Sequence, residues 1–479
     1  MDRSVYRLLA LILVVFISGA ALLTGCGTSR DSRDGDLSSD TTQQDIKEEP
    51  TTTMPEKSEP VSLTIATVNN PDMLIMQSLT PKFTEKTGIE LNYIILPENE
   101  LRQKVTEDVR IGAGKYDIVT IGTYDTPFWG QNKWIESLEP YFDSMSPEEK
   151  KEYDREDIIT TIRSALSYKG AQYALPFYGE SSMLYYRKDL FEKAGLEMPE
   201  KPTWEQVYEF ARKLHNPSKQ QYGIILRGQP GWGMNMAVFA SLINTFGARW
   251  YDMQWQPQFN TPRMKNCWEF YKKIITDAGE PEAYKAGNLE CLDLFSGGNG
   301  AMWYDATVFA GALSNKDSKV KGKVGYALAP TAVKDNAGWL WAWSLAIESS
   351  SKKKDAAFKF MTWATSKEYI ELVGNEIGWA QVPPGTREST YENSRYLEAA
   401  PFARITLESI KNVNYEKPTI DPVPYVGIQY VSIPEFQSLG ELVSQQLSAY
   451  LADKKGVDEA LEASQEAADK VAAEGGYRR

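Results

Sequence analysis

The order of predicted strands and helices from residue 61 to 121 constrains the fold of this chain more than any other feature. Strand and helix patterns alternate there, beginning and ending with a strand. The predicted strands are 63–67, 91–96 and 116–121, and the predicted helices are 73–83 and 101–111. Such a βαβαβ series indicates an α/β fold with a mostly parallel sheet. Ligands of such sheets bind beyond the carboxyl ends of the strands.

The stretch from Tyr173 to Gln206 indicates where one lobe ends and another begins. Two short runs of strand-forming residues, 173–176 and 183–186, flank a polar, glycine-containing segment at 177–182 that we interpret as a turn. A helix with capping-box spacing follows at Thr203 and Gln206. We expect the chain to cross between two lobes at this turn.

Length supports more than one core, because 479 residues exceed the roughly 100–200 residues of a single domain. Further strands are predicted at 222–226 and 339–347, and further helices at 261–278, 354–364 and 434–473. A second crossing is expected near 324–328 and a third between 401 and 425. The predicted lobes are 61–175 with 327–395, and 176–326 with 396–479.

The N-terminus indicates the compartment. Arg3 and Arg7 precede an apolar run at 8–16, which is typical of a secretory signal. Leu23-Thr24-Gly25-Cys26 matches a bacterial lipobox, so residues 1–26 are predicted to be a lipoprotein signal peptide, with lipid on Cys26. The alternative is an uncleaved anchor, which the small residues before the cysteine disfavour.

Residues 27–60 are predicted to form a disordered tether, because they contain almost no large apolar side chains. The net charge of −13 argues against a nucleic-acid partner and against electrostatic attachment to an anionic membrane. Cys267 and Cys291 can form a disulfide or remain two buried thiols. A zinc site is not expected, since the chain has one histidine and no CxxC motif.

Enzyme motifs are incomplete. Gly179 and Ser181 are followed by Met183, where a nucleophile elbow requires glycine. The glycine-rich segment 297–300 lacks the lysine and hydroxyl residue of a phosphate-binding loop. A glycoside hydrolase stays open as a remote alternative, because 65 acidic residues supply some carboxylate pair by chance.

Six ordered segments carry a resemblance to a known family. They are LTIATVNN (63–70), YDIVTIGTY (116–124), LPFYGESS (175–182), LRG with GWG (226–228 and 231–233), WLWAWS (339–344) and PPGTR (383–387). Together they resemble the family-1 extracellular solute-binding proteins of sugar ABC importers, and within them the sorbitol/mannitol-binding branch. The resemblance covers about residues 61–450.

The resemblance implies a two-lobe clamshell of the type II periplasmic-binding-protein class, each lobe a mixed, mostly parallel sheet flanked by helices. It implies a monomeric, lipid-anchored protein on the outer face of the cell membrane, without a cofactor or catalysis. Such a protein captures a sugar alcohol between its lobes and delivers it to the transmembrane permease subunits. Another mono- or oligosaccharide is the alternative ligand.

A polyol requires hydrogen-bonding side chains and an aromatic wall. In the first lobe the candidates are Asn69, Tyr124, Asp125, Trp341 and Trp343. Asn69 is also a common turn former, and Asp125 precedes a proline turn. The two tryptophans share one strand face, which is either a packed sheet face or a stacking surface.

Five further candidates lie at the crossing and in the second lobe: Glu180, Arg227, Trp232, Asn235 and Asp305. Glu180 is either a solvated carboxylate or a ligand contact. The Arg227 guanidinium can donate hydrogen bonds to two adjacent hydroxyls or form an ion pair with a nearby acid. Asp305 either caps the following segment or meets the ligand.

Overall fold

The computed structural model describes residues 61–336 and 338–478. The predicted signal peptide at 1–26, the lipidation site Cys26 and the tether at 27–60 therefore lie outside the described residues. In the described part of the chain, no helix has the length and apolar character needed to cross a membrane.

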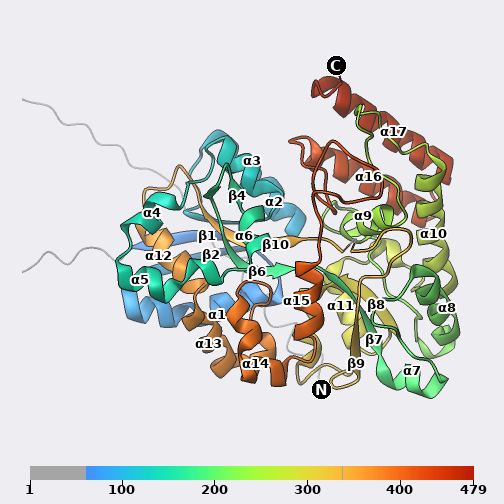
Figure 1. Cartoon of the computed structure of the whole chain (residues 1–479), viewed down its shortest axis with the longest axis horizontal. Helices are drawn as coiled ribbons and strands as arrows, with labels where there is room; N and C mark the ends of the chain where they lie inside the picture. The colour runs from blue at the N-terminus through green and yellow to red at the C-terminus, as the bar shows by residue number, and fades with distance from the viewer. Residues whose placement is uncertain (1–60, 337, 479) are drawn as a thin grey trace, which may run out of the picture. The chain divides into compact units, whose positions relative to one another are not determined.

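A mixed five-stranded sheet forms the centre of the first lobe (Figure 1). Its strand order is β2 (Glu90–Leu96), β1 (Ser62–Val68), β3 (Ile118–Ile121), β10 (Trp341–Ile347) and β6 (Leu175–Glu180). β1 pairs with β2 and β3 in parallel, whereas β10 is antiparallel to β3 and β6. The central strands β3 and β10 are buried throughout, as expected for strands covered on both faces.

Several helices pack on this sheet, and two of them follow its parallel strands. α1 (Pro71–Thr87) packs on β2, α2 (Glu98–Ile111) on β1, α6 (Thr160–Ala165) on β6 and α12 (Lys354–Ala364) on β10. α1 begins after Asn70, whose side-chain oxygen accepts a hydrogen bond from Met73 N, and it has Pro71 in its first turn. The predicted βαβαβ series is thus present, with boundaries within a few residues of those expected.

The second lobe contains a three-stranded sheet of order β8 (Met302–Ala306), β7 (Ser182–Arg187) and β9 (Val324–Leu328). Both pairings of β7 are antiparallel, which differs from the mostly parallel sheet expected there. The expected strand at 222–226 makes only isolated parallel bridges to Gly300 and Trp303. Its amides donate to three different carbonyls: Tyr222 to Asn299 O, Gly223 and Ile224 to Ala278 O, and Ile225 to Met302 O.

Helices surround this second sheet. They are α7 (Lys188–Ala194), α8 (Trp204–Leu214), α9 (Asn235–Thr245), α10 (Pro262–Ala278), α11 (Asn288–Ser296), α16 (Phe436–Leu451) and α17 (Val457–Glu474). α10 packs against α8, α9 and α17, and α16 packs against α9 and α17. Cys267 and Cys291 are buried free thiols in this lobe.

The remaining helices and strands are α3 (Asp125–Gln131), α4 (Glu139–Ser144), α5 (Pro147–Tyr153), α13 (Lys367–Val373), α14 (Ser394–Ala399), β4 (Ser167–Tyr168) and β5 (Ala171–Gln172).

The crossing segments differ from the predicted turn. β6 continues in the first sheet to Glu180 and β7 starts in the second sheet at Ser182, so only Ser181 separates them. Gly179 lies inside β6 because a neighbouring segment approaches closely there: an added Cβ would lie 2.3 Å from Gly385 O. The glycine that indicated a turn is therefore required by packing.

Two other segments join the lobes. Residues 329–340 connect β9 of the second sheet to β10 of the first. α15 (Ala403–Lys411) contacts β6, β7 and β9, and thus both sheets. We call these two segments and the β6–β7 junction the three crossings.

Candidate functional site

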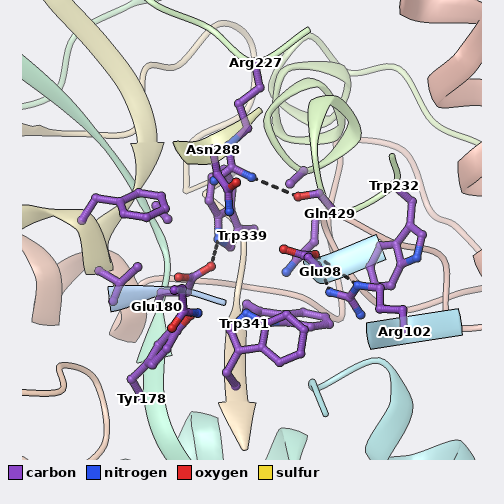
Figure 2. A pocket seen from close by; sticks show the side chains of 17 residues that line it. Glu98, Arg102, Tyr178, Glu180, Arg227, Trp232, Asn288, Trp339, Trp341 and Gln429 are labelled. Atoms are coloured by element: carbon purple, nitrogen blue, oxygen red, sulfur yellow. Dashed lines mark hydrogen bonds and ion pairs between the residues drawn. The ribbon is translucent and has the colours of Figure 1, made fainter. Parts of the chain in front are cut away.

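A small pocket lies between the two lobes, next to the crossings (Figure 2). Its volume is about 40 Å³, and its walls come from both lobes. The lining residues are Asn70, Glu98, Arg102, Tyr178, Glu180, Arg227, Trp232, Gly233, Ala237, Asn288, Ala306, Val308, Phe309, Trp339, Trp341, Trp343 and Gln429.

Tryptophans form one wall of the pocket. Trp341 and Trp343 are two residues apart on β10, so both side chains project from the same face of the sheet. Their ring centres are 5.5 Å apart, and Trp232 of the second lobe lies 5.7 Å from Trp341, with both pairs edge to face. Trp341 can occupy this place because Gly122 has no side chain: an added Cβ would lie 1.9 Å from the Trp341 ring.

Arg102 of α2 lies against this wall. Its guanidinium carbon is 3.9 Å from the ring centre of Trp232 and 4.8 Å from those of Trp341 and Trp343, which is within the range of cation–π attraction. Glu98, one helical turn earlier, accepts hydrogen bonds from Arg102 Nε at 3.1 Å and Nη2 at 2.8 Å. The i,i+4 spacing on α2 thus places the Glu98 carboxylate beside the Arg102 guanidinium, and the carboxylate neutralises the positive charge that is buried in the pocket wall (Figure 2).

Glu180 faces the pocket at the end of β6. Its backbone pairs with Trp341, and its Oε1 accepts a hydrogen bond of 3.2 Å from Trp339 Nε1 (Figure 2). Burial raises the pKa of Glu180 to about 8, although the Arg227 charge and the Trp339 hydrogen bond act in the opposite direction. At neutral pH the carboxyl group is therefore mainly protonated and can both donate and accept hydrogen bonds.

Arg227 enters the pocket from the second lobe and is held by a buried partner. Its Nε donates to Asp305 Oδ2 at 2.9 Å, its Nη2 contacts Asp305 Oδ1, and its Nη1 donates to Gly233 O at 3.0 Å. Burial opposes the charge, but the Asp305 carboxylate outweighs it and raises the pKa of Arg227. Asp305 lies behind the arginine, where it also accepts from Trp303 Nε1 at 3.0 Å.

Asn70 and Tyr178 form another polar part of the wall. Asn70 Nδ2 donates to Tyr178 Oη at 2.7 Å, while its oxygen caps α1. Burial raises the pKa of Tyr178 well above its usual value, so this side chain stays neutral. Both side chains thus offer uncharged hydrogen-bonding groups.

Three buried polar atoms at the pocket have no hydrogen-bond partner in the described parts of the chain. They are Arg102 Nη1, Trp232 Nε1 and Gln429 Oε1. Two of them are donors and one is an acceptor. None of the three has surface exposed to the cavity, and Arg102 Nη1 lies 3.7 Å from the Asp125 carboxylate, so these atoms belong to the packed wall.

The structure brings five of the ten predicted ligand-binding residues together at this pocket: Glu180, Arg227, Trp232, Trp341 and Trp343. The other five, Asn69, Tyr124, Asp125, Asn235 and Asp305, do not line it. Asn69 is exposed, whereas the next residue, Asn70, is buried and lines the pocket. Neighbouring residues at a strand end point in different directions, so a shift of one position exchanges the two roles.

Tyr124 and Asp125 have partners within the protein instead. Tyr124 Oη donates to Ile433 O at 2.9 Å, and its ring packs edge to face on Trp232 from behind the pocket wall. Asp125 Oδ2 accepts from Gly122 N at 3.1 Å and lies 3.7 Å from Arg102 Nη1. Burial raises the pKa of Asp125.

The side chains of Asn235 and Asp305 also form their hydrogen bonds with other parts of the protein. Asn235 Nδ2 donates to Ser444 O at 3.0 Å inside the second lobe. Asp305 is paired with Arg227, which is the alternative that the sequence left open for that arginine. Neither residue lines the cavity: Asp305 holds the pocket residue Arg227, and Asn235 holds the backbone of α16.

Several residues that line the pocket were not predicted from the sequence. Glu98 and Arg102 could have been identified as an ion pair on a helix, because they are four residues apart and directly follow a predicted strand. Asn70 precedes Pro71 and reads as a helix cap, which it is. Gln429 gave no signal, because it lies in a segment of turns and bends between α15 and α16.

Comparison with known proteins agrees with this architecture. Residues 68–371 match the model of the bacterial extracellular solute-binding protein family. A mannitol-binding protein from Pseudomonas aeruginosa is 48% identical over 419 residues, which cover 87% of this chain and 94% of that protein.

Two solved structures resemble the chain over most of their length. An ABC transporter solute-binding protein from Agrobacterium vitis with bound D-mannitol has a TM-score of 0.83 and 49% identity, covering 87% of this chain and 99% of that one. One from Agrobacterium radiobacter in complex with ribitol has a TM-score of 0.76 and 27% identity, covering 86% and 98%. The predicted two-lobe α/β fold class is thereby confirmed. The chain belongs to the bacterial extracellular solute-binding protein family, and it is an extracytoplasmic binding protein for a small molecule, not an enzyme.

Proposed function

We propose that this protein binds a linear sugar alcohol such as D-mannitol in the pocket between its lobes. The uncharged hydrogen-bonding side chains of Asn70, Tyr178 and Glu180, which line the pocket beside the tryptophans, carry this proposal. Hydroxyl groups both donate and accept hydrogen bonds, so a row of them can pair with these amide, phenol and carboxyl groups.

The charge balance of the wall supports an uncharged ligand. Arg102 is paired with Glu98, and Arg227 is paired with Asp305. The raised pKa of Glu180 keeps its carboxyl group mainly neutral at pH 7. A charged ligand would lose its hydration without meeting a free counter-charge among these groups, which is unfavourable in a buried site.

The apolar part of the wall supports a ligand with a carbon chain. Trp341 and Trp343 line the pocket with their ring centres 5.5 Å apart. The ligands of the relatives agree with this, since D-mannitol and ribitol are both acyclic polyols. Stacking against Trp341 and Trp343 would cover the carbon chain.

Calorimetric titration tests the proposal. D-mannitol, sorbitol and arabitol are titrated into the protein beside maltose and glucose. We expect saturable binding of at least one alditol that is tighter than that of either sugar. Tight binding of maltose with no response to any alditol would overturn the proposal and favour an oligosaccharide ligand.

The wider role is capture and delivery. We infer that the protein is held at the outer face of the membrane by lipid on Cys26 and presents its closed form to the permease subunits of an ABC importer. Cys26→Ser is then expected to release the protein from the membrane fraction or to leave it unprocessed. Lipid labelling that persists without Cys26 would exclude this anchor.

A further inference from the structure

The two lobes also touch outside the ligand pocket, where Gln381 of the first lobe meets Gly311 of the second. Gln381 Nε2 donates a hydrogen bond of 2.7 Å to Gly311 O. Neither residue lines the ligand pocket. The closed form can therefore make this contact whichever solute the pocket holds.

The first-lobe side of the contact is anchored on α13. A π-helical turn, Gly374–Gly378, continues that helix and leads into a short helix, Trp379–Gln381. Trp379 packs so closely on Gly374 that an added Cβ there would lie 2.5 Å from the indole ring. The guanidinium carbon of Arg395 lies 4.4 Å from the centre of the same ring. Turns of this kind are rare and are often found at functional sites.

On the second-lobe side, Gly311 needs to lack a side chain only because the first lobe approaches it. Its backbone angles, φ −59° and ψ −47°, are accessible to every residue except proline's neighbours, so conformation does not require glycine. An added Cβ would, however, lie 2.5 Å from Ala380 O of the first lobe. Phe309, two residues earlier, stacks on Trp303 of β8 with ring centres 5.4 Å apart, which holds this segment on the second lobe.

The contact lies between the ligand pocket and solvent. Val308 and Phe309 line both the pocket and a neighbouring cavity of about 10 Å³. That cavity shares part of its lining with a surface hollow of about 740 Å³, namely Pro71, Ala312, Ala380 and Gln381. The hollow reaches solvent, because Lys316 and Ile377 in its lining are exposed. A solute that leaves the pocket on this side has to separate the two lobes at the hydrogen bond.

We propose that Gln381 and Gly311 form a latch, which holds the lobes closed over the pocket and limits the release of solute. Both are positioning residues, because they act on the lobes and do not line the pocket. The inference rests on the proposed function for its choice of test solutes.

The latch acts on affinity through the equilibrium between open and closed forms. A contact that exists only in the closed form raises the population of that form, and the apparent affinity rises with it. The latch touches no solute, so its loss should weaken the binding of every solute by the same factor. This loss should appear mainly as faster release.

Gln381→Glu and Gly311→Ala test the latch from its two sides, in the full chain in detergent. A glutamate carboxylate has nearly the size of the amide but cannot donate to Gly311 O, so we expect about a threefold or greater loss of D-mannitol affinity. Gly311→Ala pushes Ala380 O away and should cost about fivefold or more. Sorbitol affinity should fall by the same factor in each variant. Calorimetric titration gives the affinities, and stopped-flow tryptophan fluorescence gives the release rates.

The controls are matched to these two variants. Gln77→Glu adds the same charge at an exposed site of α1, and Gly456→Ala adds a methyl group with nothing within 4 Å of it. Both should release D-mannitol as the parent does. The ligand-free latch variants should unfold at the same midpoint as these controls, because opened lobes do not make the contact.

Three results would overturn the latch. They are parent-like release by both Gln381→Glu and Gly311→Ala, a change in the ratio of D-mannitol to sorbitol affinity, and a lowered unfolding midpoint of both ligand-free variants. The second would indicate direct contact with solute, and the third a structural role alone. Failure of the alditols to bind would contradict the proposed function only, and the common factor is then measured with maltose and glucose.

Discussion

The guanidinium carbon of Arg102 lies 3.9 Å from the ring centre of Trp232, and this contact joins a helix of the first lobe to a loop of the second. Both side chains also line the ligand pocket. A ligand that touches both therefore has contacts in the closed form that separated lobes do not offer. Such differential affinity is what allows a ligand to drive closure.

Trp232→Ala should weaken both binding and closure. A buried tryptophan at the centre of a binding site typically contributes about 2 kcal/mol or more, so we expect at least a 30-fold loss of D-mannitol affinity. At subsaturating ligand, small-angle scattering should show less compaction than for the parent chain. Trp255→Ala is the control, because Trp255 stacks on Tyr477 in the same lobe and does not line the pocket. Parent-like binding by Trp232→Ala would contradict the assignment of the pocket.

Gly122→Ala should act through its neighbour Trp341. The added Cβ would lie 1.9 Å from the indole ring, so the ring must move toward the cavity. Overpacking of this kind costs about 1–3 kcal/mol of stability, and the displaced ring should obstruct the ligand. Denaturant unfolding and mannitol titration measure the two effects. Gly456→Ala is the control, since nothing lies within 4 Å of a Cβ there; equal behaviour of the two variants would show that Trp341 is not held by this contact.

The sequence predicted the elements of the first lobe well because their signals are local. Hydrophobic spacing and caps specify β1, α1, β2 and α2, and tertiary packing does not override them. Gly179 misled the prediction, since a glycine needed for close approach to Gly385 O looks the same as one needed for a turn. The antiparallel pairing in the second sheet was also missed, because strand pairing depends on contacts between distant segments.

The site was only partly predictable for a similar reason. Strand period was enough to predict that Trp341 and Trp343 share one face, and both line the pocket. Asp305 was predicted to contact the ligand because nothing in the sequence shows that the Arg227 side chain lies between Asp305 and the cavity. Gln429 lies in a segment without periodicity, so only the folded chain brings it to the pocket.

Glu180 should make stability depend on pH. Its pKa rises from an ordinary 4.5 to about 8 on folding, so the folded state binds the extra proton between these values. The resulting stability is fully present below pH 4.5 and is lost as pH rises through 8, at no more than about 1.4 kcal/mol per pH unit. Asp72 and Glu348, whose pKa values also rise to about 7, contribute slopes of the same sign.

The measurement is therefore the difference in unfolding free energy between the parent and Glu180→Gln from pH 5 to 9. That difference should shrink steadily as pH rises; a constant difference would show that Glu180 is ionised throughout.

Variants of the Arg227–Asp305 pair distinguish a residue that stabilises the fold from one that contacts the ligand. Asp305→Asn leaves a buried arginine without its counter-charge, which should destabilise the protein by about 3–5 kcal/mol. Mannitol affinity should fall as well, because Arg227 loses the partner that orients it. The exposed pair of Arg263 and Asp421 provides the control, and Asp421→Asn should change the unfolding midpoint little.

A double variant then distinguishes the two effects of Asp305→Asn. Arg227→Gln combined with Asp305→Asn removes both charges and keeps an oxygen that can accept from Trp303 Nε1. With no unpaired charge left inside, at least half of the lost stability should return. Mannitol affinity should nevertheless stay low, because Arg227 and not Asp305 faces the cavity. Recovery of affinity together with stability would mean that Arg227 acts only in folding, and loss of affinity in a fully stable Asp305→Asn would place Asp305 itself against the ligand.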